Sequence, residues 1–241
     1  MRRIIIVLFS LLSLSLYGQR SLFLQEIAVG VSGGMDFSKV SFLHNLPANA
    51  VELGNVGMRS EIKGGILARY ISMKHFGVQA EVNYVQSGWR ERFKDGDHVG
   101  GEDFSGVEIS RRLDYIEIPL LSHIYFGKKV RFFFNIGPKL GILVSYGDLK
   151  DNLSPGQIAV FNPDDPRIYD KGHNRFDYGL AVGGGLDLQI GRLHTVVEGR
   201  YTFGFGDVYS NSKRDIYQRS NNQNVAVTVG VLLPVKRFYG N

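Results

Sequence analysis

The 241-residue sequence contains no cysteine, seven prolines and one tryptophan. The absence of cysteine excludes disulfide scaffolds, thiolate metal sites and cysteine nucleophiles. A net charge of +5, from 28 Lys and Arg against 23 Asp and Glu, is too small to indicate a nucleic-acid-binding protein. Glycine is abundant at 30 residues, and 12% of the chain is aromatic. This composition argues against disorder and favours many short strands.

The sequence also lacks an apolar run long enough to cross a membrane as a helix. The longest apolar run is about 14 residues and ends near Leu16, after the positive start at Arg2 and Arg3. Small Gly18 precedes a plausible cleavage point. These features predict a secretory signal peptide at residues 1–18 and one mature domain at 19–241. The alternative is a retained N-terminal membrane anchor.

Beyond residue 18 the hydrophobic period is two, which indicates strands. In 130–146 the even positions are apolar, from Val130 to Tyr146, and most odd positions are small or polar, as at Asn135 and Lys139. Alternating segments recur at 27–35, 61–71, 76–84, 116–120, 130–146, 176–190, 193–205 and 225–235. Eight such segments predict an all-β fold, an eight-stranded antiparallel up-and-down barrel.

The connections between these segments alternate in length. Short links fall at 72–75, 127–129 and 191–192, and long links fall at 37–58, 94–109, 147–174 and 209–223. Short turns on one side and long loops on the other are typical of transmembrane barrels of the outer membrane. The short turns and both termini are then expected on the periplasmic side, with the long loops outside the cell.

A soluble barrel alternates too, so the outward face needs its own argument. The apolar face is bulky, whereas the opposite face holds Gly, Ala and charges that fit a narrow interior. Aromatic residues lie near strand ends, where membrane interfaces favour them: Tyr70, Phe76, Tyr84, Tyr125, Phe126, Tyr146, Tyr178, Tyr201 and Phe205. We therefore expect an outer-membrane protein in contact with lipid. The alternative is a periplasmic lipocalin-like barrel with an apolar pocket.

The inward face is predicted to gather a lumen charge network. Its members are Glu61, Lys63, Arg69, Glu81, Glu117, Arg131, Lys139, Asp177, Asp187, Glu198 and Arg200. Charges at low dielectric need partners. A pore lining and a structural plug are both open readings, and the plug is favoured because eight strands enclose only enough space for side chains.

Two long loops mix aromatic and charged residues, which are favoured at binding surfaces. The candidate contacts are Phe161, Arg167 and Tyr169 in 147–174, and Tyr209, Arg214 and Tyr217 in 209–223. They are candidates for contact with other envelope proteins. The alternative is a solvated loop without a partner.

No catalytic, cofactor or metal site is predicted. The six histidines form no metal-binding spacing, and Ser122 and His123 are neighbours that point to opposite faces of a strand. Acidic groups that attract Ca²⁺ occur in two loops (Asp95, Asp97, Glu102 and Asp103; Asp164, Asp165 and Asp170), but neither has EF-hand spacing. Glycines 183–185 predict a bend or close packing, and Pro138 predicts irregular strand pairing.

The stretch from Leu113 to Leu121, with its Tyr115-x-Glu117-x-Pro119 phrase, resembles the outer-membrane β-barrel domain family of Bacteroidota, often labelled PorT-type. The segment from Asn135 to Pro138 supports the resemblance, which extends over about residues 25–235. It implies an eight-stranded outer-membrane barrel. The namesake is an accessory of type IX protein secretion, although the hairpin at 123–130 departs from the basic, Asn-rich hairpin of the secretion members.

These observations predict a non-catalytic outer-membrane barrel that acts in structure, binding or assembly through its extracellular loops. An accessory role in type IX secretion, a narrow porin-like channel and a lipid-modifying enzyme are the alternatives.

Overall fold

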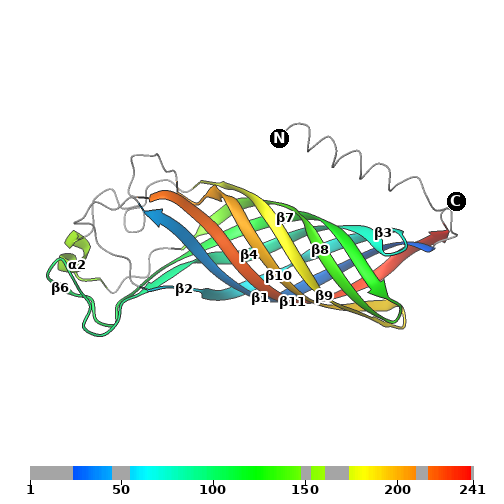
Figure 1. The fold of residues 1–241 in the computed structure, drawn as a ribbon, viewed down its shortest axis with the longest axis horizontal. Coiled ribbons are helices and arrows are strands. Elements are labelled where there is room, and N and C mark those ends of the chain that lie inside the picture. The colour runs from blue at the N-terminus through cyan, green and yellow to red at the C-terminus, as the bar shows by residue number, and fades with distance from the viewer. Residues whose placement is uncertain (1–23, 45–54, 148–152, 161–173, 210–216, 240–241) are drawn as a thin grey trace.

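A computed structural model describes residues 24–44, 55–147, 153–160, 174–209 and 217–239. Its eight long strands form one antiparallel ring, because neighbours in sequence pair in turn, β4 also pairs with β7, and β1 pairs with β11 (Figure 1). The strands are β1 Leu24–His44, β3 Arg59–Met73, β4 Phe76–Arg92, β7 Glu108–Gly127, β8 Val130–Tyr146, β9 Phe176–Ile190, β10 Leu193–Asp207 and β11 Tyr217–Tyr239. The predicted eight-stranded antiparallel fold is confirmed.

Four smaller elements lie at the loop end of the ring (Figure 1). Strand β2 (Asn55–Gly57) pairs with the outer part of β4, and β5 (His98–Val99) forms a hairpin with β6 (Glu102–Asp103). Helix α2 covers Pro155–Val160. No helix in the described part of the chain is long and apolar enough to cross a membrane.

The three predicted short links are confirmed as tight turns at the other end of the ring. Each contains one residue with left-handed backbone: His75 with φ 75°, Gly127 with φ 112° and Gly191 with φ 62°. His75 is the non-glycine case. Its carbonyl oxygen accepts a hydrogen bond from the Tyr125 N–H at 3.1 Å, and its ring nitrogen Nδ1 lies 2.9 Å from the Tyr125 carbonyl oxygen. These two contacts hold the turn against β7.

Several strands are longer than the alternation predicts. Residues 37–44 and 217–223 belong to β1 and β11, where Phe42 pairs with Ser220, so the expected loops at 37–58 and 209–223 are partly wrong. Hydrophobic alternation marks a strand only where one of its two faces meets an apolar environment. Toward the loops the outer face is polar, as at Ser41 and Gln223, while strand pairing continues.

The apolar side chains face outward. Phe132 is 65% exposed, Ile66 61% and Val31 60%, which is unusual for the surface of a water-soluble protein. On β11 the apolar positions run from Val225 to Val235. At about 3.3 Å per residue and a tilt of about 40°, this band is about 25 Å tall, the height of the apolar band on transmembrane barrels. The outer surface therefore fits a bilayer.

The predicted irregular pairing at Pro138 is confirmed on one side of β8. The pairing of β8 with β9 is regular through residues 136–140. On the β7 side the ladder lacks pairs at 137 and 138 and resumes in the same register, without a bulge. The missing N–H of proline is thus accommodated by a gap in one ladder, so a bulge at this position is excluded.

Candidate functional site

The interior of the ring is filled with charged and polar side chains. At the turn end, Arg69 of β3 donates from Nη1 to Asp187 Oδ2 of β9 at 2.9 Å. His194 lies between two carboxylates, 2.9 Å from Asp187 Oδ1 and 3.0 Å from Glu26 Oε1. Arg237 donates to the other oxygen of Glu26 at 2.7 Å. This group connects strands β1, β3, β9, β10 and β11.

The middle of the interior is organised around Arg200 of β10. Its two terminal nitrogens donate to both oxygens of Glu81 on β4, each at 2.7 Å, in the bidentate geometry that carboxylates favour. Its Nε and Nη2 also donate to Glu198 at 2.9 Å. Asn83 and Asn135 donate to these carboxylates from β4 and β8. The guanidinium is therefore held between two carboxylates, each supported by an amide.

The third level lies nearer the loops. Lys139 of β8 donates to Glu117 of β7 at 2.7 Å and to Asp177 of β9 at 3.1 Å. The Lys63 Nζ atom lies 3.6 Å from the second oxygen of Glu117. All four side chains are buried. Two of them are basic and two are acidic, so each buried charge has a partner of opposite sign, as burial requires.

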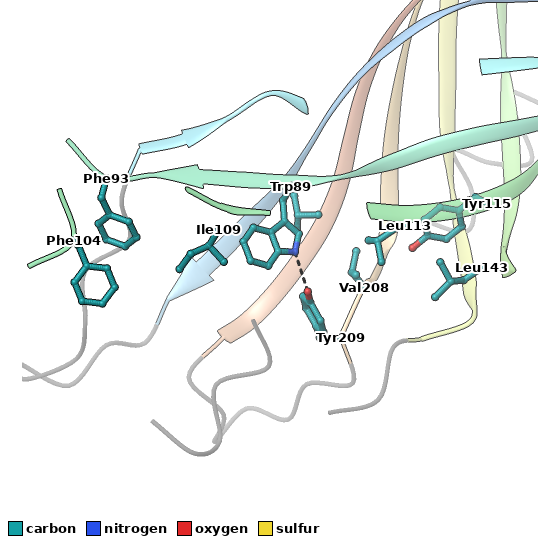
Figure 2. Close-up of a cluster of buried hydrophobic side chains, with 10 residues drawn as sticks. Trp89, Phe93, Phe104, Ile109, Leu113, Tyr115, Leu143, Val208 and Tyr209 are labelled. Atoms are coloured by element: carbon teal, nitrogen blue, oxygen red, sulfur yellow. Dashed lines mark hydrogen bonds between the residues drawn. The ribbon is translucent and has the colours of Figure 1, made fainter. Parts of the chain in front are cut away.

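The loop end of the interior contains an apolar cluster, although the charged side chains of Glu91 and Arg111 are buried at the same end. Trp89 of β4 donates from Nε1 to the Tyr209 hydroxyl at 2.9 Å, and both side chains are fully buried (Figure 2). Leu113 and Tyr115 of β7 and Leu143 of β8 belong to the same cluster and lie to the right of Trp89 and Tyr209 in Figure 2. We call this cluster the cap; its buried members are Val40, Trp89, Phe93, Phe104, Ile109, Leu113, Tyr115, Leu143, Val208 and Tyr209.

Four side-chain hydrogen bonds between described residues cross the full width of the ring. In the order of strands around the barrel, β3 lies opposite β9, β4 opposite β10, and β7 opposite β11. The crossing pairs are Arg69–Asp187, Arg200–Glu81, Tyr115–Asn222 and Trp89–Tyr209, the last of which joins β4 to the residues just after β10. Side chains therefore bridge the lumen at four levels.

A small cavity lies within the charged region. It is bordered by Arg69, Glu81, Glu198 and Arg200 and measures about 20 Å³, room for about one water molecule. A cavity of this size is far smaller than a channel and fits an interior filled by side chains.

The loop between β4 and β7 is built as an ordered hairpin. Asp103 accepts the Ser105 N–H at 2.8 Å and its hydroxyl, and these bonds lower the pKa of the exposed Asp103 carboxyl. Asp97 accepts the backbone N–H of Lys94 at 2.7 Å. Phe93 packs on Phe104 with ring centroids 4.9 Å apart. These acids thus shape the turn. In the described part of the chain, no group of His, Asp and Glu side chains is arranged so that it could hold a metal ion.

The structure places nine of the eleven predicted lumen residues in the connected groups described above. Glu61 lies apart, at the loop end, paired with Arg59 of its own strand. Arg131 lies at the turn end, 5.0 Å from the Tyr125 ring centroid and bonded to the Lys128 carbonyl oxygen. Glu61 and Arg131 therefore lie at the two ends of the predicted charge network, and Arg131 is the cross-strand neighbour of Asp187.

The predicted loop contacts fare differently. Tyr209 is fully buried in the cap, which contradicts its expected role as a surface contact. Tyr217 is the first residue of β11, so it belongs to a strand. Phe161, Arg167, Tyr169 and Arg214 lie outside the described residues.

Sequence reasoning missed several interior partners. Glu26 and Arg237 lie at the turn-end extremes of β1 and β11, just outside the alternating segments 27–35 and 225–235. The alternation of odd and even positions marks Gln79, Asn83 and Asn135 as inward. The hydrogen bonds that their side-chain amides donate to Glu81 and Glu198 were not predicted. Tyr125, expected in the interfacial girdle, instead faces inward beside His123, with ring centroids 5.7 Å apart. The alternation along β7 would have placed Tyr125 inside, since its neighbour Phe126 faces the lipid.

A closed ring with an apolar exterior and a charged interior defines a transmembrane β-barrel protein. The chain belongs to the outer membrane protein beta-barrel domain family, whose model matches residues 18–210. This membership places the protein in an outer membrane.

Three solved structures illustrate the likeness. Ail of Yersinia pestis, solved with the heparin analogue sucrose octasulfate, is 14% identical with a TM-score of 0.40, over 86% of this chain and 99% of that chain. Neisserial surface protein A is 13% identical with a TM-score of 0.40, over 86% and 97%. AlkL, solved in lipid bilayers, is 14% identical with a TM-score of 0.39, over 91% and 95%. No curated protein matches the chain. The family assignment rests on the match over residues 18–210.

Proposed function

We propose that this protein is a non-catalytic, non-conducting outer-membrane barrel that acts in binding or assembly through its extracellular loops. The observation that supports this proposal is the set of four side-chain bridges across the lumen, from Arg69–Asp187 to Trp89–Tyr209. A lumen filled in this way offers no route for solutes. What remains for contact with the exterior is the loop end.

Absence of catalysis is part of the proposal. Ser122 and His123 point to opposite sides of β7, and His123 is buried with its Nδ1 2.7 Å from Asn135 Oδ1. This arrangement cannot bring a serine nucleophile to a base. We also propose that residues 1–18 are a signal peptide that is cleaved after Gly18, which mass spectrometry of the mature N-terminus tests.

Conductance tests the closed lumen. The purified, folded protein is inserted into planar bilayers, with a general porin as the positive control. We expect no stable single-channel steps from the wild-type protein. Large and persistent steps would contradict a filled lumen and favour the narrow-channel alternative.

Cross-linking tests the role of the loops. Ser154 is exposed just before α2, and the chain contains no cysteine, so Ser154→Cys supplies the single thiol. Intact cells are treated with a membrane-impermeant thiol cross-linker. A discrete heavier adduct is expected if the loops contact a partner protein. A labelled product without any adduct would favour a stand-alone barrel with a structural role.

The secretion alternative is favoured by one observation, the Tyr115-x-Glu117-x-Pro119 phrase of the PorT-type resemblance. Deletion of the gene separates it from the main proposal. Loss of secreted type IX cargo would favour the accessory role, and unchanged secretion would exclude it.

A further inference from the structure

Basic side chains gather at the turn end of the barrel. Exposed Lys or Arg residues occupy all three tight turns and the end of the last strand: Lys74, Lys128, Lys129, Arg192, Lys236 and Arg237. The turns join β3 to β4, β7 to β8 and β9 to β10, and the end of β11 lies beside β1. The basic residues therefore recur at every second strand junction around the whole ring, at the end where β1 begins and β11 ends (Figure 1).

Exposed acidic residues do not balance this charge among the described residues of the turn end (24–28, 70–78, 122–133, 187–196 and 233–238). The two acids there, Glu26 and Asp187, are 8% and 0% exposed and are engaged with His194, Arg237 and Arg69. The loop end differs. There exposed Lys94 is followed by Asp95 and Asp97, and Arg92 pairs with Glu108. Net positive charge is thus a property of the turn end, although one of its basic residues, Arg237, is paired with Glu26.

Aromatic side chains place this charge at the level of a membrane interface. The Tyr70 and Phe238 rings stack with centroids 6.5 Å apart, and the Lys236 Nζ lies 5.6 Å from the Phe238 ring centroid. His75 of the β3–β4 turn stacks on exposed Phe126 at the end of β7, with ring centroids 5.2 Å apart. Aromatic rings favour the head-group region, and lysine chains extend from it to reach charged groups.

We propose that this basic ring binds anionic phospholipid head groups of the leaflet at the turn end. Basic residues close to anionic head groups are attracted to them, and the attraction falls off within a Debye length. Distribution around the whole circumference fits lipids, which surround a barrel. A folded acidic protein partner would instead fit charge gathered on one side.

Spin-labelled lipids test this proposal. The full-length mature barrel is reconstituted in phosphatidylcholine vesicles, and the relative affinity of spin-labelled phosphatidylglycerol against spin-labelled phosphatidylcholine is measured at low salt and in 1 M NaCl. We expect about two- to threefold preference for phosphatidylglycerol at low salt, and loss of the preference at high salt because exposed charges are screened. This measurement uses the wild-type protein and does not depend on the role of the loops.

Matched variants locate the effect. Lys74→Gln, Lys129→Gln and Arg192→Gln together remove three exposed charges from the turn end, and Lys94→Gln, Arg175→Gln and Arg219→Gln remove three from the loop end. Heat-dependent gel mobility confirms that both variants fold. We expect a weaker preference in the turn-end variant, which keeps Lys128, Lys236 and Arg237, and an unchanged preference in the loop-end variant. Equal affinity of the wild-type protein for both lipids, or equal effects of the two variants, overturns the proposal; the former outcome would favour an acidic protein as the occupant.

Discussion

Arg200 shows why the interior charges must be considered as a unit. Its guanidinium makes four contacts of 2.9 Å or less to Glu81 and Glu198, and all three side chains are buried. Removing one partner from such a group leaves charge buried without compensation, which costs more than the interaction itself contributes. The interior therefore tolerates loss of a whole group better than loss of one member.

Arg200→Ala is expected to lower the free energy of unfolding by about 3–5 kcal/mol, because two carboxylates then remain buried side by side. Denaturant unfolding from lipid vesicles, followed by circular dichroism, measures the change. Arg92→Ala is the control, since Arg92 pairs with Glu108 at 2.7 Å but is 64% exposed, and such pairs contribute below about 1 kcal/mol. Equal losses in the two variants would contradict a buried, mutually dependent group.

Gly185 provides a second test at the residue scale. A Cβ atom there would meet the Val197 carbonyl oxygen and lie 2.9 Å from the Phe133 ring, whereas a Cβ at Gly199 would meet nothing within 4 Å. Gly185→Ala is expected to destabilise the barrel by about 1–3 kcal/mol through overpacking, with Gly199→Ala close to wild type. The same vesicle unfolding measures both. If Gly185→Ala were as stable as Gly199→Ala, the close packing predicted from the glycine run would be wrong.

At the scale of elements, the cap depends on four strands that extend beyond the apolar band, β1, β4, β7 and β11. Val40, Trp89, Ile109 and Leu113 come from the extended parts of β1, β4 and β7, and Ser220 of β11 holds the chain near Tyr209 by donating its N–H to Asp207 at 2.7 Å. The extensions thus surround an apolar core outside the bilayer. A water-exposed rim is expected to need such a core, since lipid no longer supports its outer face.

Trp89 reports directly on this core, because it is the only tryptophan in the sequence. We expect the fluorescence emission of Trp89 in the folded protein to be shifted to the blue and to be quenched only weakly by iodide. Tyr209→Phe removes the acceptor of the Trp89 N–H and is expected to cost about 1–3 kcal/mol and to increase quenching. Tyr146→Phe is the control, because Tyr146 is 46% exposed on the outer face and outside the cap. Strong quenching of the wild-type protein would contradict a closed cap.

The elements were predictable where one face meets lipid. The tight turns at Gly127 and Gly191 and the alternation in 130–146 appear in the sequence as they do in the structure. The outer ends of β1 and β11 were not, because Asn221 and Asn222 fall in the segment 209–223 that was predicted as a loop, although they form paired strand. Asn222 and Asn224 instead donate to Tyr115 and Asp36 inside the barrel. Polar pairing across the interior leaves no periodic signal.

At the scale of the whole molecule, the alternation of odd and even positions along each strand is enough to place most charged residues inside, including Glu81, Glu198 and Arg200. It does not say which charges meet, because that depends on which strands lie opposite one another in the closed ring. Arg200 contacts Glu81 across 119 residues of sequence. Only the count of eight strands and the order of their pairing place β4 opposite β10.

The last prediction concerns the orientation of the whole barrel in the outer membrane. Short turns face the periplasm in transmembrane barrels, so Ser154 at the loop end and Lys128 in the β7–β8 turn should lie on opposite sides of the outer membrane. Each is replaced singly by cysteine in a chain that has none, and intact cells are treated with a membrane-impermeant maleimide. Ser154→Cys is expected to react in intact cells, and Lys128→Cys only after the outer membrane is permeabilised.

Two control outcomes separate orientation from location. Both positions are exposed, so failure of either to react after lysis would indicate misfolding and not burial. Reaction of Lys128→Cys alone in intact cells would mean that the barrel is inverted, and the basic ring would then face the outer leaflet. Protection of both until permeabilisation would contradict extracellular loops and with them the proposed function, whereas the lipid preference of the basic ring, measured in symmetric vesicles, would be unaffected. The physical reason is that charge and aromatic placement act on whichever leaflet the turn end meets.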